Sequence, residues 1–357
     1  MTRPVHSDSS SMLTSPDESP YFGDEKWWVE NYDFILLSGY QLRPRYNSKW
    51  VPSWTIQRND KQEYEDGIAS YISTPALDAI RLNDGAKVVL KRMPTEGQEL
   101  KIALLLSSPG LRSDPRNRTI PITEVIPVVG SSWTLLVMPY CRRFDDPPFH
   151  CRAEFIEAMQ QYLEGLQFMH DHNISHFDIA CQNLMMDETR VVPAGSHFVR
   201  PRTHSGFLRF FRWKNRCAVG PIDHYYIDFG LSMHFPGGQD TASTVGTLRT
   251  FPTIPELSQT TPYNPFKVDI YQLGLVMQRI IESYPALQDF RQVAATMMHQ
   301  DPCNRPVPAA SLAQLNNIAA QMSPRILKSA MRKKNGLVDC LTRSLFGGYF
   351  PSTPFTV

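Results

Sequence analysis

The residues with the clearest chemical potential lie between positions 176 and 230. Asp178 precedes Asn183 by five positions, and Asp228 begins an Asp-Phe-Gly tripeptide. Carboxylate and amide oxygens are the ligands that a hard cation such as Mg²⁺ prefers. Phosphoryl transfer needs positioning and charge neutralisation more than covalent chemistry. Two acids, an amide and a nearby lysine would therefore be sufficient machinery for it.

A lysine of the required kind stands on a predicted β-hairpin. Residues 76–82 and 87–93 have strand character, and the Asp84-Gly85 pair between them favours a tight turn. Lys91 follows three apolar residues in the second strand. Because alternate side chains of a strand face opposite sides, we expect this lysine to face a phosphate rather than the core.

These segments resemble protein kinases. His176-Phe177-Asp178 with Asn183, followed by Asp228-Phe229-Gly230, resembles the catalytic loop and metal-binding loop of that superfamily. Further similarities follow in the expected order. Val88-Val89-Leu90-Lys91 resembles the V-A-I-K strand, and Ile254-Pro255-Glu256 resembles the A-P-E motif. Val268–Gly274 resembles the helix whose aspartate braces the catalytic loop, and Asp301–Pro306 resembles the late motif whose arginine pairs with the A-P-E glutamate. Segments such as Leu42-Arg43-Pro44-Arg45 are similar to fungal, mainly basidiomycete, kinase-domain proteins.

The resemblance implies ATP and Mg²⁺ as cofactors, an unidentified protein as substrate, and a role for each polar residue. Lys91 would hold the phosphates, Asp178 would act on the acceptor hydroxyl, and Asn183 and Asp228 would hold the metal. Glu99, in a helix predicted over 95–106, would orient Lys91. Glu96 is the rival for that pairing, because a separation of three residues places both glutamates on nearly the same helix face.

The resemblance also places the nucleotide base. Met138 stands at the gatekeeper position of a hinge over residues 139–141. Tyr140 and Cys141 would offer backbone groups to the adenine. Pro139 has no N–H, so the donor must come from another residue.

The expected fold is an α+β, bilobal, protein-kinase-like domain. Its N-terminal lobe is a mostly antiparallel sheet with one main helix, and its C-terminal lobe is mainly helical. The predicted boundaries are a disordered lead over 1–20, an N-terminal lobe over about 21–138, the hinge over 139–141, a C-terminal lobe over 142–323 containing a basic insertion over 187–223, and a tail over 324–357.

Three departures from the kinase pattern leave other functions open. No G-x-G-x-x-G sequence precedes Lys91, Phe177 replaces the arginine of H-R-D, and Ala180 stands where Ser/Thr kinases carry a lysine. The rival interpretation is a pseudokinase that acts as a scaffold or allosteric partner. A small-molecule kinase of similar fold is the third, and the resemblance of Pro255-Glu256 and Arg305 to a peptide-binding platform opposes it.

Composition narrows the class of protein. The formal net charge is +1, so nothing global indicates binding to nucleic acid or to an anionic membrane. The six cysteines are scattered without a C-x-x-C pair, which indicates free thiols, and Cys151 is expected to pack in a core beside Phe155. The longest apolar runs are too short to cross a bilayer. We expect a soluble protein of the cytoplasm, with the nucleus as the alternative.

The insertion over 187–223 mixes arginines with aromatic residues such as Phe211 and Trp213. Such a mixture suits an acidic protein partner or nucleic acid. The simpler interpretation, which we favour, is a solvated loop whose apolar patch docks on the C-terminal lobe.

Overall fold

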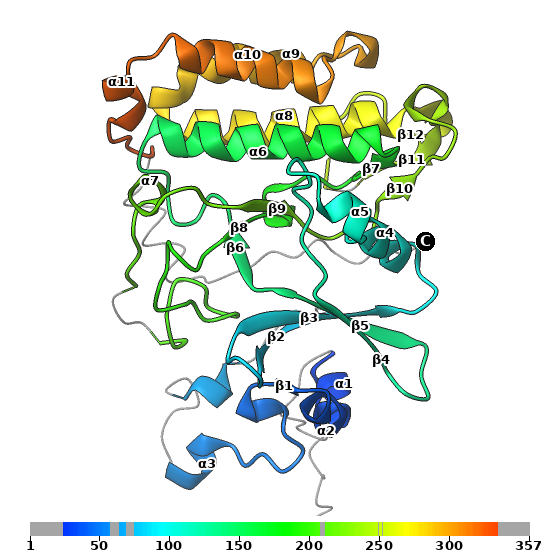
Figure 1. The fold of residues 1–357 in the computed structure, drawn as a ribbon, viewed down its shortest axis with the longest axis vertical. Coiled ribbons are helices and arrows are strands. Elements are labelled where there is room, and N and C mark those ends of the chain that lie inside the picture. Colours follow the sequence, from blue (N-terminus) through cyan, green and yellow to red (C-terminus); the bar gives the residue numbers. More distant parts are fainter. Residues whose placement is uncertain are drawn as a thin grey trace, which may run out of the picture.

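The computed structural model shows a sheet-based N-terminal lobe joined to a larger, mainly helical C-terminal lobe (Figure 1). It describes residues 24–57, 64–68, 75–207, 211–248, 250–251 and 253–334. The predicted lead over 1–20 and the tail beyond residue 334 lie outside the described residues. None of the described helices is both long enough and apolar enough to cross a membrane.

An antiparallel five-stranded sheet in the order β1-β2-β3-β5-β4 forms the N-terminal lobe. Its strands are β1 (Tyr40–Gln41), β2 (Ala76–Arg81), β3 (Lys87–Pro94), β4 (Glu124–Pro127) and β5 (Trp133–Pro139). The predicted hairpin is confirmed as β2 and β3. Gly85 turns it with φ of 71°, in the left-handed region where glycine avoids the steric cost of a side chain.

The two faces of this sheet contact different partners. Val88 and Leu90 point to a core that includes Trp28 of helix α1 (Glu25–Glu30) and Ile35 of helix α2 (Tyr32–Leu37). Leu136 and Met138, from the opposite face, belong to the core that continues into the C-terminal lobe. Since Lys91 lies opposite Leu136 in the β3–β5 register, it shares the face that is turned toward the C-terminal lobe.

Helix α4 (Gln98–Leu106) covers that second face, with Leu100, Ile102, Ala103 and Leu106 buried. It begins three residues later than the predicted helix, because Gly97 adopts an extended backbone (φ −69°, ψ 149°) and acts as the N-cap. The short helix α5 (Pro109–Arg112) follows and leads toward β4.

Helices α6 and α8 run through the centre of the C-terminal lobe (Figure 1), and His170 of α6 contacts Asp269 of α8 at 3.0 Å. The helices of this lobe are α6 (Arg152–Asp171), α7 (Arg216–Val219), α8 (Pro265–Ser283), α9 (Arg291–Met297), α10 (Pro308–Ala320) and α11 (Pro324–Lys328). Three small sheets complete it. One has three strands in the order β6 (Cys141–Arg143), β8 (Leu184–Asp187) and β9 (His224–Tyr226). The other two pair β7 (Ile174–Ser175) with β10 (Met233–His234), and β11 (Thr244–Gly246) with β12 (Ser258–Tyr263). The main core surrounds α6 and α8.

The predicted hinge over 139–141 coincides with the passage from β5 to β6. Strand β5 extends to Pro139 and β6 begins at Cys141, which leaves Tyr140 between them. Both residues beside Tyr140 are paired, Pro139 with Val88 and Cys141 with Asp187.

The insertion over 187–223 is described except for residues 208–210. Val191 and Val192 are buried, and Phe211 packs against the core of the C-terminal lobe. These contacts agree with the interpretation of an apolar patch that docks on this lobe. The insertion also reaches the N-terminal lobe, where Phe198 packs against the core below the sheet.

Candidate active site

Lys91 joins two carboxylates that come from different elements. Its Nζ donates to Glu99 in the first turn of α4 and to Oδ1 of Asp228, 2.9 Å away, in the Asp-Phe-Gly loop. Glu96 is exposed and lies before α4 begins at Gln98. The pairing that spacing left open is therefore made with Glu99.

The charges in this group support one another. Desolvation alone would lower the pKa of Lys91, but the negative charges of Asp228 and Glu99 raise it above its usual value. Desolvation would raise the pKa of Asp228, yet the charge and the hydrogen bond of Lys91 bring it below the ordinary value of an aspartate. Both partners therefore remain ionised near neutral pH.

Asp178 and Asn183 form a second pair on the loop between β7 and β8. The Asn183 Nδ2 donates to the Asp178 backbone oxygen at 2.9 Å and to its Oδ2 at 2.8 Å. Both donor bonds lie on one side of the amide, so its Oδ1 is directed away from Asp178 and suits a hard cation. Asp178 is buried, and desolvation followed by the nearby Asp228 charge raises its pKa despite the opposing charge of His176.

Helix α8 holds the backbone of this loop in a costly conformation. Phe177 has φ of 66°, which a bulky side chain adopts only when its surroundings impose it. The Asp269 carboxylate accepts the N–H of His176 at 2.9 Å and of Phe177 at 2.7 Å. Gln272 accepts the N–H of Ile179 at 2.9 Å. The predicted bracing by Asp269 is confirmed.

The Asp-Phe-Gly loop is tied to the same segment. His176 Nε2 donates to the backbone oxygen of Ile227 at 3.0 Å, and Ile227 N–H donates to the backbone oxygen of Asn183 at 3.0 Å. Phe229 is buried with its ring 5.4 Å from the imidazole of His176. Asp228, which has φ of 66°, therefore lies at a fixed position beside Asp178 and Lys91.

The residues predicted to contact a nucleotide base lie at the other end of the same sheet face. Met138 is buried opposite Val89 on β3. Phe144 N–H donates to Leu184 O, and hydrogen-bonded pairs alternate along an antiparallel ladder. The Cys141–Asp187 pair, three residues further along this ladder, is therefore a non-hydrogen-bonded pair. The backbone N–H of Cys141 is directed away from β8.

Sequence reasoning missed a polar group around Tyr140. The Lys87 Nζ lies 4.1 Å from the centre of the Tyr140 ring and donates to the backbone oxygen of Ser196 at 2.6 Å. The Tyr140 hydroxyl and Ser196 Oγ are 3.0 Å apart. Asp78 of β2 lies 3.4 Å from Lys87 Nζ. The sequence contained one sign of this group: Lys87 precedes Lys91 by four residues in the same strand, so the two side chains lie on the same face.

The described part of the connection between β1 and β2 contacts both α1 and the insertion. This part is held by side chains: Arg45, fully buried, pairs with Glu25 of α1 at 2.9 Å, and the Trp50 indole donates to Asp66 at 2.8 Å. His197 of the insertion contacts Glu65 in this connection at 3.1 Å. The insertion thus meets the connection between β1 and β2 through this contact.

The segment after the Asp-Phe-Gly loop docks on an apolar cluster. Phe177 stacks on Tyr263 with ring centres 6.2 Å apart and planes at 17°. Leu248, Phe251 and Ile254 pack in the same cluster. Phe177, which takes the place of an arginine, therefore holds this segment by apolar contact rather than by charge.

Comparison with known families agrees with the geometry. The model of the protein kinase domain matches residues 131–344, more than half of the chain. The matched span includes Asp178, Asn183 and Asp228, whereas Lys91 and Glu99 precede it.

Proposed function

Since this chain belongs to the protein kinase family, we propose that it is an active kinase that transfers the γ-phosphoryl group of ATP to Ser/Thr hydroxyls of proteins. The observation that carries the proposal is the contact of Lys91 with both Glu99 and Asp228. A lysine held between these carboxylates is positioned beside the residues of the metal-binding loop. Such preorganisation of charge is the main source of catalysis in phosphoryl transfer.

Each of the remaining residues has a part in this mechanism. Asp178 orients the acceptor hydroxyl and takes its proton as the oxygen attacks. Asn183, through Oδ1, and Asp228 would hold Mg²⁺, and both offer the oxygen ligands that this ion requires. Mg²⁺, when bound with ATP, neutralises charge on the β- and γ-phosphates. Lys91 would hold the phosphates, and Glu99 would keep its ammonium group in place.

The backbone of Cys141 and the apolar surface of Met138 would receive the adenine, as the resemblance implies. A Ser/Thr preference follows the same resemblance. A peptide library with Ser, Thr and Tyr acceptors at otherwise identical positions tests it. Phosphate on Ser or Thr peptides supports the preference, and phosphate mainly on Tyr peptides contradicts it.

A second candidate function, a pseudokinase scaffold, is favoured by one specific observation. Ser196 of the insertion contacts both Lys87 and Tyr140, at the end of the sheet face where adenine would bind. A segment held there would lie beside the groups proposed to receive the adenine and would limit the access of a nucleotide to them. In that case the contact between Lys91 and Asp228 would stabilise the fold of the domain and would not support phosphoryl transfer.

The two functions are separated by measuring transfer of labelled γ-phosphate to peptides and to the protein itself. Lys91→Met and Asp178→Asn serve as matched variants, because each removes one charged group. Incorporation that disappears in both variants supports the kinase. The pseudokinase scaffold is supported if the wild type transfers no more phosphate than Asp178→Asn does and if ATP with Mg²⁺ does not raise its melting temperature.

A further inference from the structure

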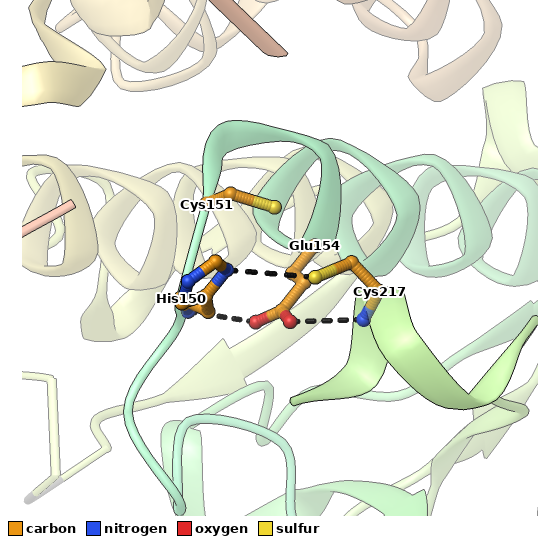
Figure 2. A group of neighbouring side chains, drawn as sticks. All are labelled: His150, Cys151, Glu154 and Cys217. Carbon is orange, nitrogen blue, oxygen red and sulfur yellow. Dashed lines mark hydrogen bonds between the residues drawn. The ribbon is translucent and has the colours of Figure 1, made fainter. Parts of the chain in front are cut away.

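Four side chains with metal-ligating atoms meet at the start of α6, away from the candidate active site. They are His150, Cys151, Glu154 and Cys217, and their ligand atoms all lie within 4.8 Å of one another (Figure 2). We propose that His150, Cys151 and Cys217, with Glu154 or a water molecule as the fourth ligand, bind a zinc ion that fastens the insertion to α6.

The elements that supply these residues are distant in sequence. Cys151 is the N-cap of α6, with His150 directly before it and Glu154 in the first turn. Cys217 lies on α7, within the insertion. A bound ion would therefore join the two segments at one point.

The donor set and one measured distance suit zinc. Two thiols, an imidazole and a carboxylate are ligands that Zn²⁺ takes in tetrahedral sites, with Zn–S of about 2.3 Å and Zn–N of about 2.0 Å. These bond lengths place sulfur and nitrogen about 3.5 Å apart at tetrahedral angles. The Cys217 Sγ and His150 Nδ1 are 3.5 Å apart.

Hydrogen bonds hold the two segments together at this point. Glu154 accepts the backbone N–H of His150 at 2.8 Å and of Cys217 at 2.9 Å, so one carboxylate positions both ligand-bearing residues (Figure 2). Arg216, next to Cys217, is buried and donates to the backbone oxygens of Phe144 and Pro147 at 2.7 Å each. Such outer contacts orient the ligands of protein metal sites.

Charge and exposure are also compatible with an ion. The Arg216 guanidinium lies 3.5 Å from Glu154 and offsets its charge, which leaves two thiolates to balance one Zn²⁺. Cys151 and Glu154 are buried, His150 is half-buried and Cys217 is exposed. The cluster therefore has a protein-lined interior and a side from which an ion can arrive.

The test uses the full chain, purified under reducing conditions, incubated with Zn²⁺ and freed of excess metal. Zinc per chain is measured by mass spectrometry, and affinity by competition with a chromophoric chelator. We expect one zinc per chain, and more than about tenfold weaker binding in Cys217→Ser and in His150→Ala. Cys303→Ser is the matched control, because Cys303 is exposed and outside the cluster, and it should bind as the wild type does.

Substitution of Co²⁺ for zinc gives a spectroscopic readout that does not depend on a variant folding. The proposal expects the absorption of tetrahedral cobalt with thiolate charge transfer. It is overturned if the wild type retains no zinc, if Cys217→Ser retains as much as the wild type, or if the cobalt spectrum lacks thiolate bands. A Cys151–Cys217 disulfide that persists after purification under reducing conditions would equally overturn it.

Discussion

Arg305 and Glu256 form a bidentate ion pair, with the Arg305 Nη2 2.8 Å from Glu256 Oε2 and Nη1 bound to Oε1. The Arg305 side chain is completely buried. It also donates to the backbone oxygens of His299 and Lys267, at 2.8 Å each. The predicted pairing of these two residues is confirmed. It joins the end of the activation segment, which runs from the Asp-Phe-Gly loop to Glu256, to the loop before α10.

Removing one partner of this pair should destabilise the domain. Glu256→Ala leaves the Arg305 charge buried and unpaired, for which we expect a loss of about 3 kcal/mol or more in the free energy of unfolding. Urea denaturation measures it. Glu282→Ala, at an exposed glutamate of α8, should cost less than about 0.5 kcal/mol. Equal losses of unfolding free energy in the two variants would show that the Arg305–Glu256 pair stabilises the domain no more than an exposed glutamate does.

Neutralising Glu99 should reduce phosphoryl transfer, because Lys91 loses the carboxylate that orients it. Glu99→Gln is expected to lower kcat/KM at least about tenfold, a loss of about 1.4 kcal/mol in transition-state stabilisation. Glu96→Gln makes the same charge change on an exposed residue that does not contact Lys91 in the described structure. Peptide phosphorylation under matched conditions compares them. An equal decrease in both would contradict the assigned pairing.

Activity should not require phosphorylation of the activation segment through the route used by H-R-D kinases. Phe177 carries no charge to bind a phosphate and packs in the same apolar cluster as Leu248 and Phe251 of the segment. Phosphatase treatment should therefore leave the transfer rate unchanged. A loss of activity after dephosphorylation would refute this view.

The apolar anchor itself should matter for stability. Phe177→Ala removes a side chain that is only 7 % exposed, and we expect a loss of about 3 kcal/mol in the free energy of unfolding. Phe177→Leu keeps most of the apolar contact and should lose less. Chemical denaturation of both variants provides the comparison, and an equal loss would indicate that the size of the anchor is irrelevant.

His224 should make the domain sensitive to mild acid. Burial, then the charge of Arg216, lowers its pKa to about 3, and its Nε2 has no hydrogen-bond partner among the described residues. Protonation therefore favours the unfolded state, whose histidine titrates near 6.5. The stabilisation is complete above that pH and declines below it, by about 2 kcal/mol at pH 5.

Urea denaturation at pH 7 and pH 5 tests this dependence. His224→Gln retains a donor for the backbone oxygen of Ile222 but does not titrate, so it should lose less stability than the wild type between the two pH values. His234→Gln, at an exposed histidine of β10, should behave as the wild type does. A wild-type slope that persists in His224→Gln would assign the acid sensitivity to other groups.

Local patterns determined much of this protein. The alternation around Lys91 predicted a strand over 87–93, and the structure has it over Lys87–Pro94. The Asp84-Gly85 pair predicted a tight turn, and Gly85 makes it between β2 and β3 with φ of 71°. These features depend on near neighbours in the chain, so periodicity and turn residues are sufficient to find them. The order of the motifs indicated the kinase family in the same way.

Only the tertiary structure decided which distant groups meet. It selected Glu99 rather than Glu96 for Lys91, because the Gly97 cap starts α4 late and leaves Glu96 outside the helix. It also brought Cys217 to His150, which stand 67 positions apart in the chain. Contacts of this kind form when the packing of helices and strands brings together residues that are far apart in the chain. A local pattern of residues contains no information about which distant residues will meet.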